Sequence, residues 1–320
     1  MLSTVTVVLP VFAIILAGFV ARKVGFLGPN AALDLNRYVV YLALPALLFE
    51  VMAGADWSDH DLMEFVGIFV LSSGVIYALT VALCFLDSRN LADASIDGLG
   101  TSYSNMGYVG FPLCLVVLGK DSLPAVTLAG VVTTVALFAI GIVLIEVGRQ
   151  SQPRRRAIVW TVSGSLVRNP LVIWPVLGGL WGAVSVPMPA SFATFLSLLG
   201  ASAAPCALVS LGLFFADGSK ESSGRIWSKA ALLSVGKLLV HPALTFGLVM
   251  LFGLPPFLAG IAVLLAALPT GTGPFMLAEL YGRETLSSSS VVLLSTVVSI
   301  VTITLLVYWG GYADLAVTGR

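Results

Sequence analysis

Long apolar runs separated by short polar segments dominate the chain. A helix needs about 20 consecutive apolar residues to cross a bilayer, and ten runs come close to this length. They cover residues 3–22, 36–54, 62–86, 96–118, 122–147, 168–186, 190–215, 228–252, 256–281 and 286–309. The pattern therefore predicts an all-α polytopic membrane protein with ten transmembrane helices and no separate soluble domain.

The composition agrees with a membrane protein. Of the 320 residues, 58% are hydrophobic and 10% are charged, whereas a soluble domain usually carries about 25% charged residues. The 16 basic and 16 acidic residues balance, so we expect lipid and not nucleic acid as the partner of this surface. Arg22 and Lys23 follow the first apolar run instead of preceding it, which favours a retained helix over a signal peptide.

The basic residues predict the orientation, because cytoplasmic loops carry an excess of lysine and arginine. An even number of helices puts both termini on one side. If that side is extracytoplasmic, 13 of the 16 basic residues fall in cytoplasmic loops, and only Lys120 and Arg320 fall outside. The cytoplasmic set is Arg22, Lys23, Arg37, Arg89, Arg149, Arg154, Arg155, Arg156, Arg168, Lys220, Arg225, Lys229 and Arg283. We predict a multi-pass protein of the cell (inner) membrane with both termini outside.

An internal repeat divides the chain into two halves. Features of the first half recur 160 to 162 residues later, namely Pro10 at Pro170, Gly18 at Gly178, Pro45 at Pro205 and Pro112 at Pro274. Five helices per copy is an odd number, so the second copy enters the membrane from the opposite side, as in many secondary transporters. We predict a first five-helix repeat at 1–148, a cytoplasmic connecting loop at 149–167 and a second five-helix repeat at 168–320.

The fourth and ninth runs are predicted to be broken helices. Residues 101–112 read TSYSNMGYVGFP and residues 268–275 read LPTGTGPF, and both proline and glycine weaken a helix interior. Broken backbone at membrane depth is tolerated only where it is buried in protein or lines a wet cavity, and the N-terminal end of a half-helix attracts anions. We therefore expect substrate-binding residues at both breaks: Asn105, Gly107, Tyr108, Pro112, Pro269, Thr270, Gly271, Thr272 and Pro274.

These segments resemble the auxin efflux carrier family, which includes bacterial permeases and the plant PIN-type auxin carriers. The matching motifs are Asn105-x-x-x-x-Gly110-x-Pro112-Leu113, Ala267-Leu268-Pro269-x-Gly271-x-x-Pro274-Phe275-x-x-Ala278-x-x-Tyr281, Arg168-Asn169-Pro170, Ser210-Leu211-Gly212-Leu213-Phe214 and Lys237-x-x-x-x-Pro242. The resemblance covers the whole chain. It implies a fold like that of sodium/proton antiporters and bile-acid symporters, with a scaffold, a transport subdomain, and crossing broken helices four and nine. It also implies elevator-type transport of small organic anions.

Three ionisable residues within the runs are candidates for a charge or coupling role: Lys237, His241 and Glu50. Intramembrane charge is costly and usually functional. His241 follows Lys237 by four residues and therefore lies on the same helix face. The alternatives are a bundle-facing ion pair for Lys237, simple packing for His241, and extension of Glu50 to the membrane surface.

The sequence favours a secondary carrier of mono- or dicarboxylates, either auxin-like or malonate/malate-like. It contains no catalytic motif, nucleotide-binding motif or metal-ligand pattern, so we expect neither an enzyme nor a cofactor. One alternative is a sodium-coupled symporter of the bile-acid type, although acidic residues do not cluster at the breaks. Another is a membrane sensor that retains a carrier fold. Related folds often form homodimers, and the sequence leaves this state open.

Overall fold

The computed structural model describes residues 2–54, 60–149, 170–184, 186–217 and 224–310. Within these ranges the secondary structure is helical, apart from an isolated antiparallel β-bridge between Ser104 and Thr270. The predicted connecting loop at 149–167, except its first residue, and the motif residues Arg168 and Asn169 lie outside the described residues.

The first half contains α1 (Leu2–Lys23), α2 (Ala31–Tyr38), η1 (Val39–Ala43), α3 (Leu44–Ala53), α4 (His60–Ser88), α5 (Leu91–Ser102), η2 (Met106–Gly110), α6 (Phe111–Leu118), η3 (Lys120–Ser122) and α7 (Leu123–Arg149). The second half contains α9 (Pro170–Val184), α10 (Ala190–Ala201), α11 (Ala203–Asp217), α12 (Gly224–Val235), η4 (Gly236–Val240), α13 (His241–Phe252), α14 (Pro256–Ala266), α15 (Gly273–Leu280) and α16 (Thr285–Trp309).

By length and composition, six helical segments of the described chain are suited to crossing a membrane. They are Ala31–Ala53, Asp61–Ser88, Lys120–Gly148, Ala190–Ala216, Gly224–Phe252 and Thr285–Trp309. Shorter apolar helices cover Met106–Leu118, Ile173–Val184 and Pro256–Ala266. The helical architecture and these apolar segments agree with the predicted polytopic membrane protein.

Prolines explain three local widenings of the helices. The π-helical turns η1, η2 and η4 end two residues before Pro45, Pro112 and Pro242. A proline has no N–H to donate, and its ring clashes with the carbonyl four residues earlier. One wide turn accommodates this clash without ending the helix. The side chains of η2 and η4 are thereby rotated from the positions that a regular α-helix would give them.

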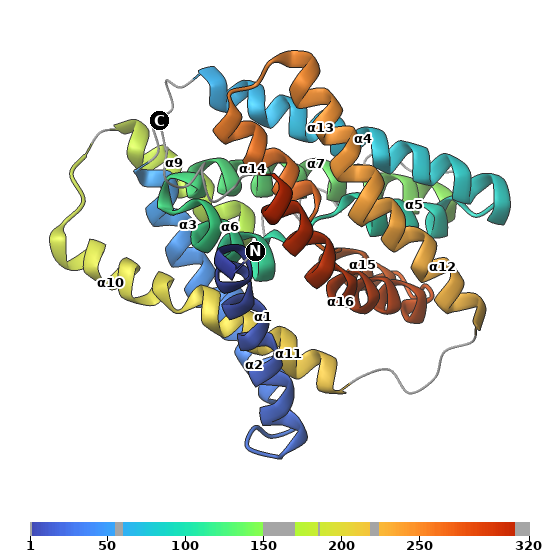
Figure 1. Ribbon diagram of the computed structural model, residues 1–320, viewed down its shortest axis with the longest axis horizontal. Helices are drawn as coiled ribbons and strands as arrows, with labels where there is room; N and C mark the ends of the chain where they lie inside the picture. The colour runs from blue at the N-terminus through green and yellow to red at the C-terminus, as the bar shows by residue number, and fades with distance from the viewer. Residues whose placement is uncertain (1, 55–59, 150–169, 185, 218–223, 311–320) are drawn as a thin grey trace.

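The helices form two groups (Figure 1). The first helix group contains α1 to α3 and α9 to α11: α1 and α2 pack on α11, and α3 packs on α9 and α10. The second helix group contains α4 to α7 and α12 to α16, with α5 lying against α4 and α7 and α12 lying against α16. In the view of Figure 1, the first group occupies the left and lower part, and the second group, apart from α6, occupies the upper and right part.

Glycines allow the closest contacts in the first helix group. A Cβ atom at Gly18 would lie 2.3 Å from the carbonyl oxygen of Val209, and one at Gly178 would lie 2.4 Å from that of Phe49. A Cβ at Gly212 would come within 2.0 Å of the oxygen of Ile15. No real Cβ fits at such distances, so these glycines permit backbone-to-backbone packing, as small residues do in membrane helices.

Candidate functional site

Two helical segments of the second group are interrupted at the place where they cross each other. The first interruption separates α5, which ends at Ser102, from η2, which begins at Met106. The second separates α14, which ends at Ala266, from α15, which begins at Gly273. The two interruptions are the helix breaks predicted from the glycines and prolines of the fourth and ninth runs.

Backbone hydrogen bonds join the two breaks directly. The Asn105 N–H donates to the Pro269 carbonyl at 2.9 Å, and the Gly271 N–H donates to the Tyr103 carbonyl at 2.9 Å. These bonds flank the β-bridge between Ser104 and Thr270. The broken backbone therefore satisfies part of its hydrogen-bonding demand by pairing with the other break, as buried backbone must.

Hydroxyl groups reinforce the crossing in a reciprocal way. Ser104 Oγ donates to the Leu265 carbonyl at 2.8 Å, and Thr270 Oγ1 donates to the Gly100 carbonyl at 2.6 Å. Each break thus supplies a hydroxyl to a carbonyl in the last turns of the other half-helix. Such carbonyls have no partner within their own helix, so the two hydroxyls stabilise both helix ends.

A buried lysine binds the end of α14. Lys237, in η4, has no exposed surface, and its Nζ donates to the Ala266 carbonyl at 2.5 Å. Its Nζ also lies 3.3 Å from His241 Nδ1, and His241 Nε2 lies 3.3 Å from Ser73 Oγ. The His241 imidazole therefore links Lys237 to Ser73 of α4. The carbonyl at the end of α14 gains a hydrogen-bond donor that its own helix cannot supply.

A cavity of about 70 Å³ adjoins the first break. Its walls come from α3, from the first break with η2, from α7, and from Gly271 and Thr272 of the second break. None of the residues that line it carries a charged side chain. They are Leu48, Tyr103, Ser104, Asn105, Met106, Gly107, Tyr108, Phe111, Thr127, Gly130, Val131, Thr133, Thr134, Gly271 and Thr272.

Three buried polar atoms in this lining have no hydrogen-bond partner among the described residues. They are Asn105 Nδ2, Thr127 Oγ1 and Thr133 Oγ1, on side chains of residues that are at most 2% exposed. The other polar atom of the Asn105 amide, Oδ1, accepts the N–H of Tyr108 at 3.2 Å. A buried polar group without a partner is costly, and a polar ligand in the cavity would satisfy these three atoms.

Aromatic packing explains why glycine is needed at the second break. A Cβ at Gly271 would lie 2.9 Å from the ring of Tyr103, and one at Gly273 would lie 2.8 Å from the ring of Phe138. The Tyr103 and Phe138 rings pack against each other at a centroid distance of 5.2 Å. Glycine therefore lets the second break approach the Tyr103 and Phe138 rings, of which Tyr103 lines the cavity.

Some of the residues predicted to bind the substrate line the cavity. Asn105, Gly107, Tyr108, Gly271 and Thr272 line it. The remaining predicted substrate-binding residues do not: Pro112 lies in the first turn of α6, Pro274 lies in α15, and Pro269 and Thr270 serve the crossing through the bonds described above. Lys237 and His241 do not line the cavity either, because Lys237 contacts the end of α14 and His241 contacts Lys237. Glu50 lies partly buried in α3.

Sequence reasoning missed the wall formed by α7. Thr127, Thr133 and Thr134 interrupt the apolar run 122–147, and this polarity is the signal that could have indicated them. Sequence reasoning also missed the contact between Tyr108 and α2, in which the Tyr108 hydroxyl donates to Asn36 Oδ1. That bond joins η2, next to the cavity, to the first helix group.

Comparisons with known proteins bear on the whole chain. Residues 3–307 match a family model described as membrane transport protein. A Rhizobium meliloti protein named "Putative malonate transporter" is 30% identical over 305 residues, covering 94% of each chain. An "Uncharacterized transporter" of Methanothermobacter thermautotrophicus is 26% identical and covers 95% of this chain and 97% of its own. The "Auxin efflux carrier component 1" of Arabidopsis thaliana is 31% identical over 158 residues, which are 48% of this chain and 25% of that protein.

Proposed function

This chain belongs to the auxin efflux carrier family of membrane transport proteins, and we propose that it is a secondary carrier of small organic carboxylates. The substrate binds in the cavity beside the crossing of the two helix breaks. The observation that carries this proposal is the set of unpartnered polar atoms, Asn105 Nδ2, Thr127 Oγ1 and Thr133 Oγ1, in the wall of that cavity.

These atoms suit a carboxylate. An amide N–H and two hydroxyls can all donate to its oxygens, and hydrogen bonds to a charged group contribute about 1.5–3 kcal/mol each. The helical segment Met106–Leu118 begins at the cavity, with Asn105 at its N-cap. Its N-terminal end adds a partial positive charge without a buried cation.

The size of the cavity favours a short acid. A buried water needs about 10–15 Å³, so a cavity of about 70 Å³ suits a ligand of roughly five to seven non-hydrogen atoms. Malonate and acids of similar length fall in this range, whereas an acid with an indole ring is larger. The full-length relative from Rhizobium meliloti is named for malonate, while the plant auxin carrier matches less than half of this chain.

We propose further that the fold is a 5+5 inverted repeat of ten membrane helices. Two sets of paired contacts support it. Gly18 contacts Val209 and Gly178 contacts Phe49, so each residue of one contact lies 160 positions from a residue of the other. In the same way, Asn105 N–H bonds to Pro269 and Gly271 N–H bonds to Tyr103, and the corresponding residues lie 166 positions apart. A two-fold relation between halves generates such exchanged pairs.

The transport cycle we propose is an elevator movement in the inner membrane, with both termini on the extracytoplasmic side. The second helix group carries both breaks, most of the cavity wall and the substrate, and it slides against the first helix group. The separation of the chain into two packed groups supports this division. The tight glycine contacts of α1 with α11 and of α3 with α9 suit a rigid scaffold.

We assign Lys237 the place that a coupling cation would take. Its Nζ already binds the Ala266 carbonyl at the end of α14, so the carrier needs no sodium ion there. Transport by Lys237→Met should fall strongly at every pH tested, because the α14 carbonyl loses its partner. Unchanged transport by this variant would leave Lys237 without a role in the cycle. We retain His241 and Glu50 as weaker candidates.

A flux measurement separates the proposal from its alternatives. Purified protein in liposomes loaded with malonate should take up labelled malonate by counterflow, at equal rates in sodium and in potassium buffer. A strict sodium requirement would favour the bile-acid type of symporter. Specific malonate binding without flux would favour a membrane sensor that retains the carrier fold.

A further inference from the structure

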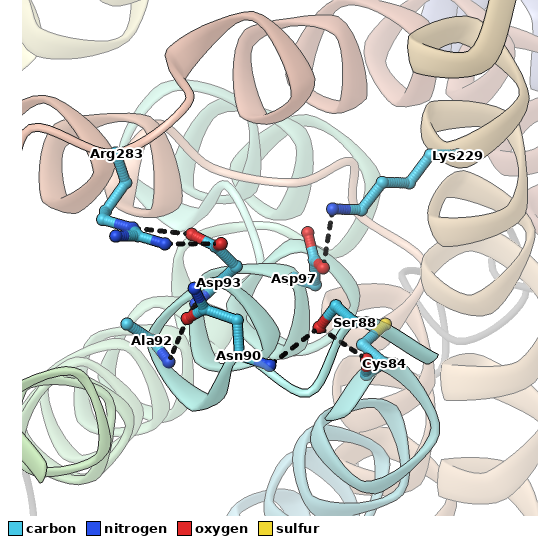
Figure 2. Close-up of polar contacts among 8 residues, drawn as sticks. All are labelled: Cys84, Ser88, Asn90, Ala92, Asp93, Asp97, Lys229 and Arg283. Atoms are coloured by element: carbon cyan, nitrogen blue, oxygen red, sulfur yellow. Dashed lines mark hydrogen bonds and ion pairs between the residues drawn. The ribbon is translucent and has the colours of Figure 1, made fainter. Parts of the chain in front are cut away.

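Two acidic residues of α5 bind basic residues from the second half of the chain (Figure 2). Arg283, in the turn between α15 and α16, donates from Nε and Nη2 to the two carboxylate oxygens of Asp93 at 2.7 and 2.5 Å. Lys229 Nζ, on α12, lies 2.8 Å from Asp97 Oδ2. Asp93 and Asp97 are four residues apart and so share a helix face. We call the contacts Asp93–Arg283 and Asp97–Lys229 the α5 ion pairs.

Burial of Asp97 distinguishes its pair with Lys229 from an ordinary surface salt bridge, which contributes little. The Asp97 side chain is 9% exposed and that of Lys229 is 38% exposed. A carboxylate as buried as that of Asp97 is unfavourable without its cation. The Asp93 pair is more exposed, but its geometry is bidentate, which adds strength and fixes the orientation. The hydrogen bond to Asp93 also raises the pKa of Arg283.

The start of α5 is fixed from its own side as well. Asn90 Oδ1 accepts the N–H groups of Ala92 and Asp93 at 3.1 and 3.2 Å, which caps the helix. Ser88 Oγ accepts the Asn90 N–H at 3.3 Å and donates to the Cys84 carbonyl at 2.9 Å, which ties the cap to α4 (Figure 2). The beginning of α5 is therefore held to α4 by hydrogen bonds and to the second half of the chain by ion pairs.

The far end of α5 reaches the cavity. The helix has 12 residues, which corresponds to about 18 Å, and Tyr103 and Ser104 follow its last residue at the crossing. The crossing holds α5 to the second break at one end, and the α5 ion pairs hold it to α12 and the α15–α16 turn at the other. α5 packs on α4 and α7 at its side, and the two attachments at its ends fix its direction relative to the second half of the chain.

We propose that the α5 ion pairs position the substrate site: they set the angle between the two broken helices and thereby the distance of Asn105 from the second break. This inference rests on the proposed function for its substrate. Asp93, Asp97, Lys229 and Arg283 are positioning residues, because they act on the cavity through α5 and do not touch the substrate.

Charge reversal tests the proposal. Asp93→Arg and Arg283→Asp should each raise the Kd for malonate by about fivefold or more, since like charges then face each other. The double variant, which restores opposite charges, should return to within about twofold of the wild type. Asp87→Arg, at the exposed end of α4, is the control and should leave the Kd unchanged. Single variants that fold and bind malonate normally, or a double variant without recovery, would overturn the proposal.

A double variant and a cysteine probe cover the case in which the charge-reversal variants do not fold. Asp97→Asn with Lys229→Gln removes both charges together, so no buried charge is left alone, and it should still raise the Kd. The reactivity of Thr133→Cys toward a small thiol reagent, in a background without the native cysteines, reports the cavity without any substrate. If the wild type does not bind malonate but charge reversal alters this reactivity, the ion-pair proposal stands and the proposed substrate fails. Unaltered reactivity in folded variants contradicts the ion-pair proposal.

Discussion

Buried polar side chains at the two breaks and on the neighbouring α7 fall into two kinds. Ser104 and Thr270 bind backbone carbonyls of the opposite half-helix, so they hold the crossing together. Asn105, Thr127 and Thr133 each keep one polar atom without a partner in the described part of the chain, and all three line the cavity. The first kind stabilises the fold, and the second kind is available to a ligand.

The hydroxyls of Thr127 and Thr133 on α7 should contribute directly to malonate binding. Thr127→Val and Thr133→Val keep the side-chain shape but remove the hydroxyl, so each should weaken malonate binding by about 1.5–3 kcal/mol, or roughly tenfold or more. The free protein should become no less stable, because an unpartnered buried hydroxyl is lost. Thermal unfolding with and without malonate measures both effects.

Thr194→Val is the matched control for this prediction. Thr194 lies exposed on α10 and donates only to the carbonyl of Ala190. Its replacement should leave the malonate-induced rise in Tm unchanged. An equal loss of malonate stabilisation in all three variants would mean that the α7 hydroxyls have no special contact with the substrate.

At the scale of elements, sequence reasoning located both breaks because proline and glycine act locally. The run LPTGTGPF cannot continue a helix, and the structure interrupts α14 there. The sequence could not indicate the partner of Lys237, because Ala266 lies 29 residues away. It also did not identify the wall formed by Thr127 and Thr133, because a polar residue in an apolar run does not reveal which neighbour its helix face meets.

The close packing of α1 on α11 in the first group should depend on glycine at position 212. Gly212→Ala should lower the free energy of unfolding by about 1–3 kcal/mol, because its Cβ would meet the Ile15 carbonyl at 2.0 Å. Gly247→Ala on α13 is the control, since nothing lies within 4 Å of its Cβ and alanine favours a helix by about 1 kcal/mol. Thermal unfolding in detergent compares the two, and equal Tm values would contradict close contact between α1 and α11.

At the scale of the whole molecule, the proposed movement of one helix group against the other can be tested by tethering. The hydrogen bond from Tyr108 to Asn36 spans the two groups, whereas that between Tyr38 and Ser202 lies within the first group. Cysteines at Asn36 and Tyr108 are joined by a short bifunctional reagent in a background without native cysteines. Because Tyr108 lines the cavity, counterflow is measured before and after the reagent, and cross-linking should abolish the malonate counterflow that remains in the untreated variant.

Cysteines at Tyr38 and Ser202 supply the comparison for this experiment. The same reagent at these positions joins two elements of the first group, so counterflow should continue. Continued counterflow with a complete cross-link between Asn36→Cys and Tyr108→Cys would show that the groups need not slide. In that case the elevator movement would have to be given up, although the substrate site would remain.

In the proposed carrier, a small carboxylate binds at the first break through the Asn105 amide. Calorimetric titration of malonate into the purified wild type, Asn105→Asp and Asn30→Asp tests this contact. Asn105→Asp keeps the shape but replaces the donor with a negative charge, so binding should be lost. Asn30→Asp, at an exposed position whose side chain does not cap α2, should bind as the wild type does. Wild-type affinity in folded Asn105→Asp would show that the substrate does not bind through this amide.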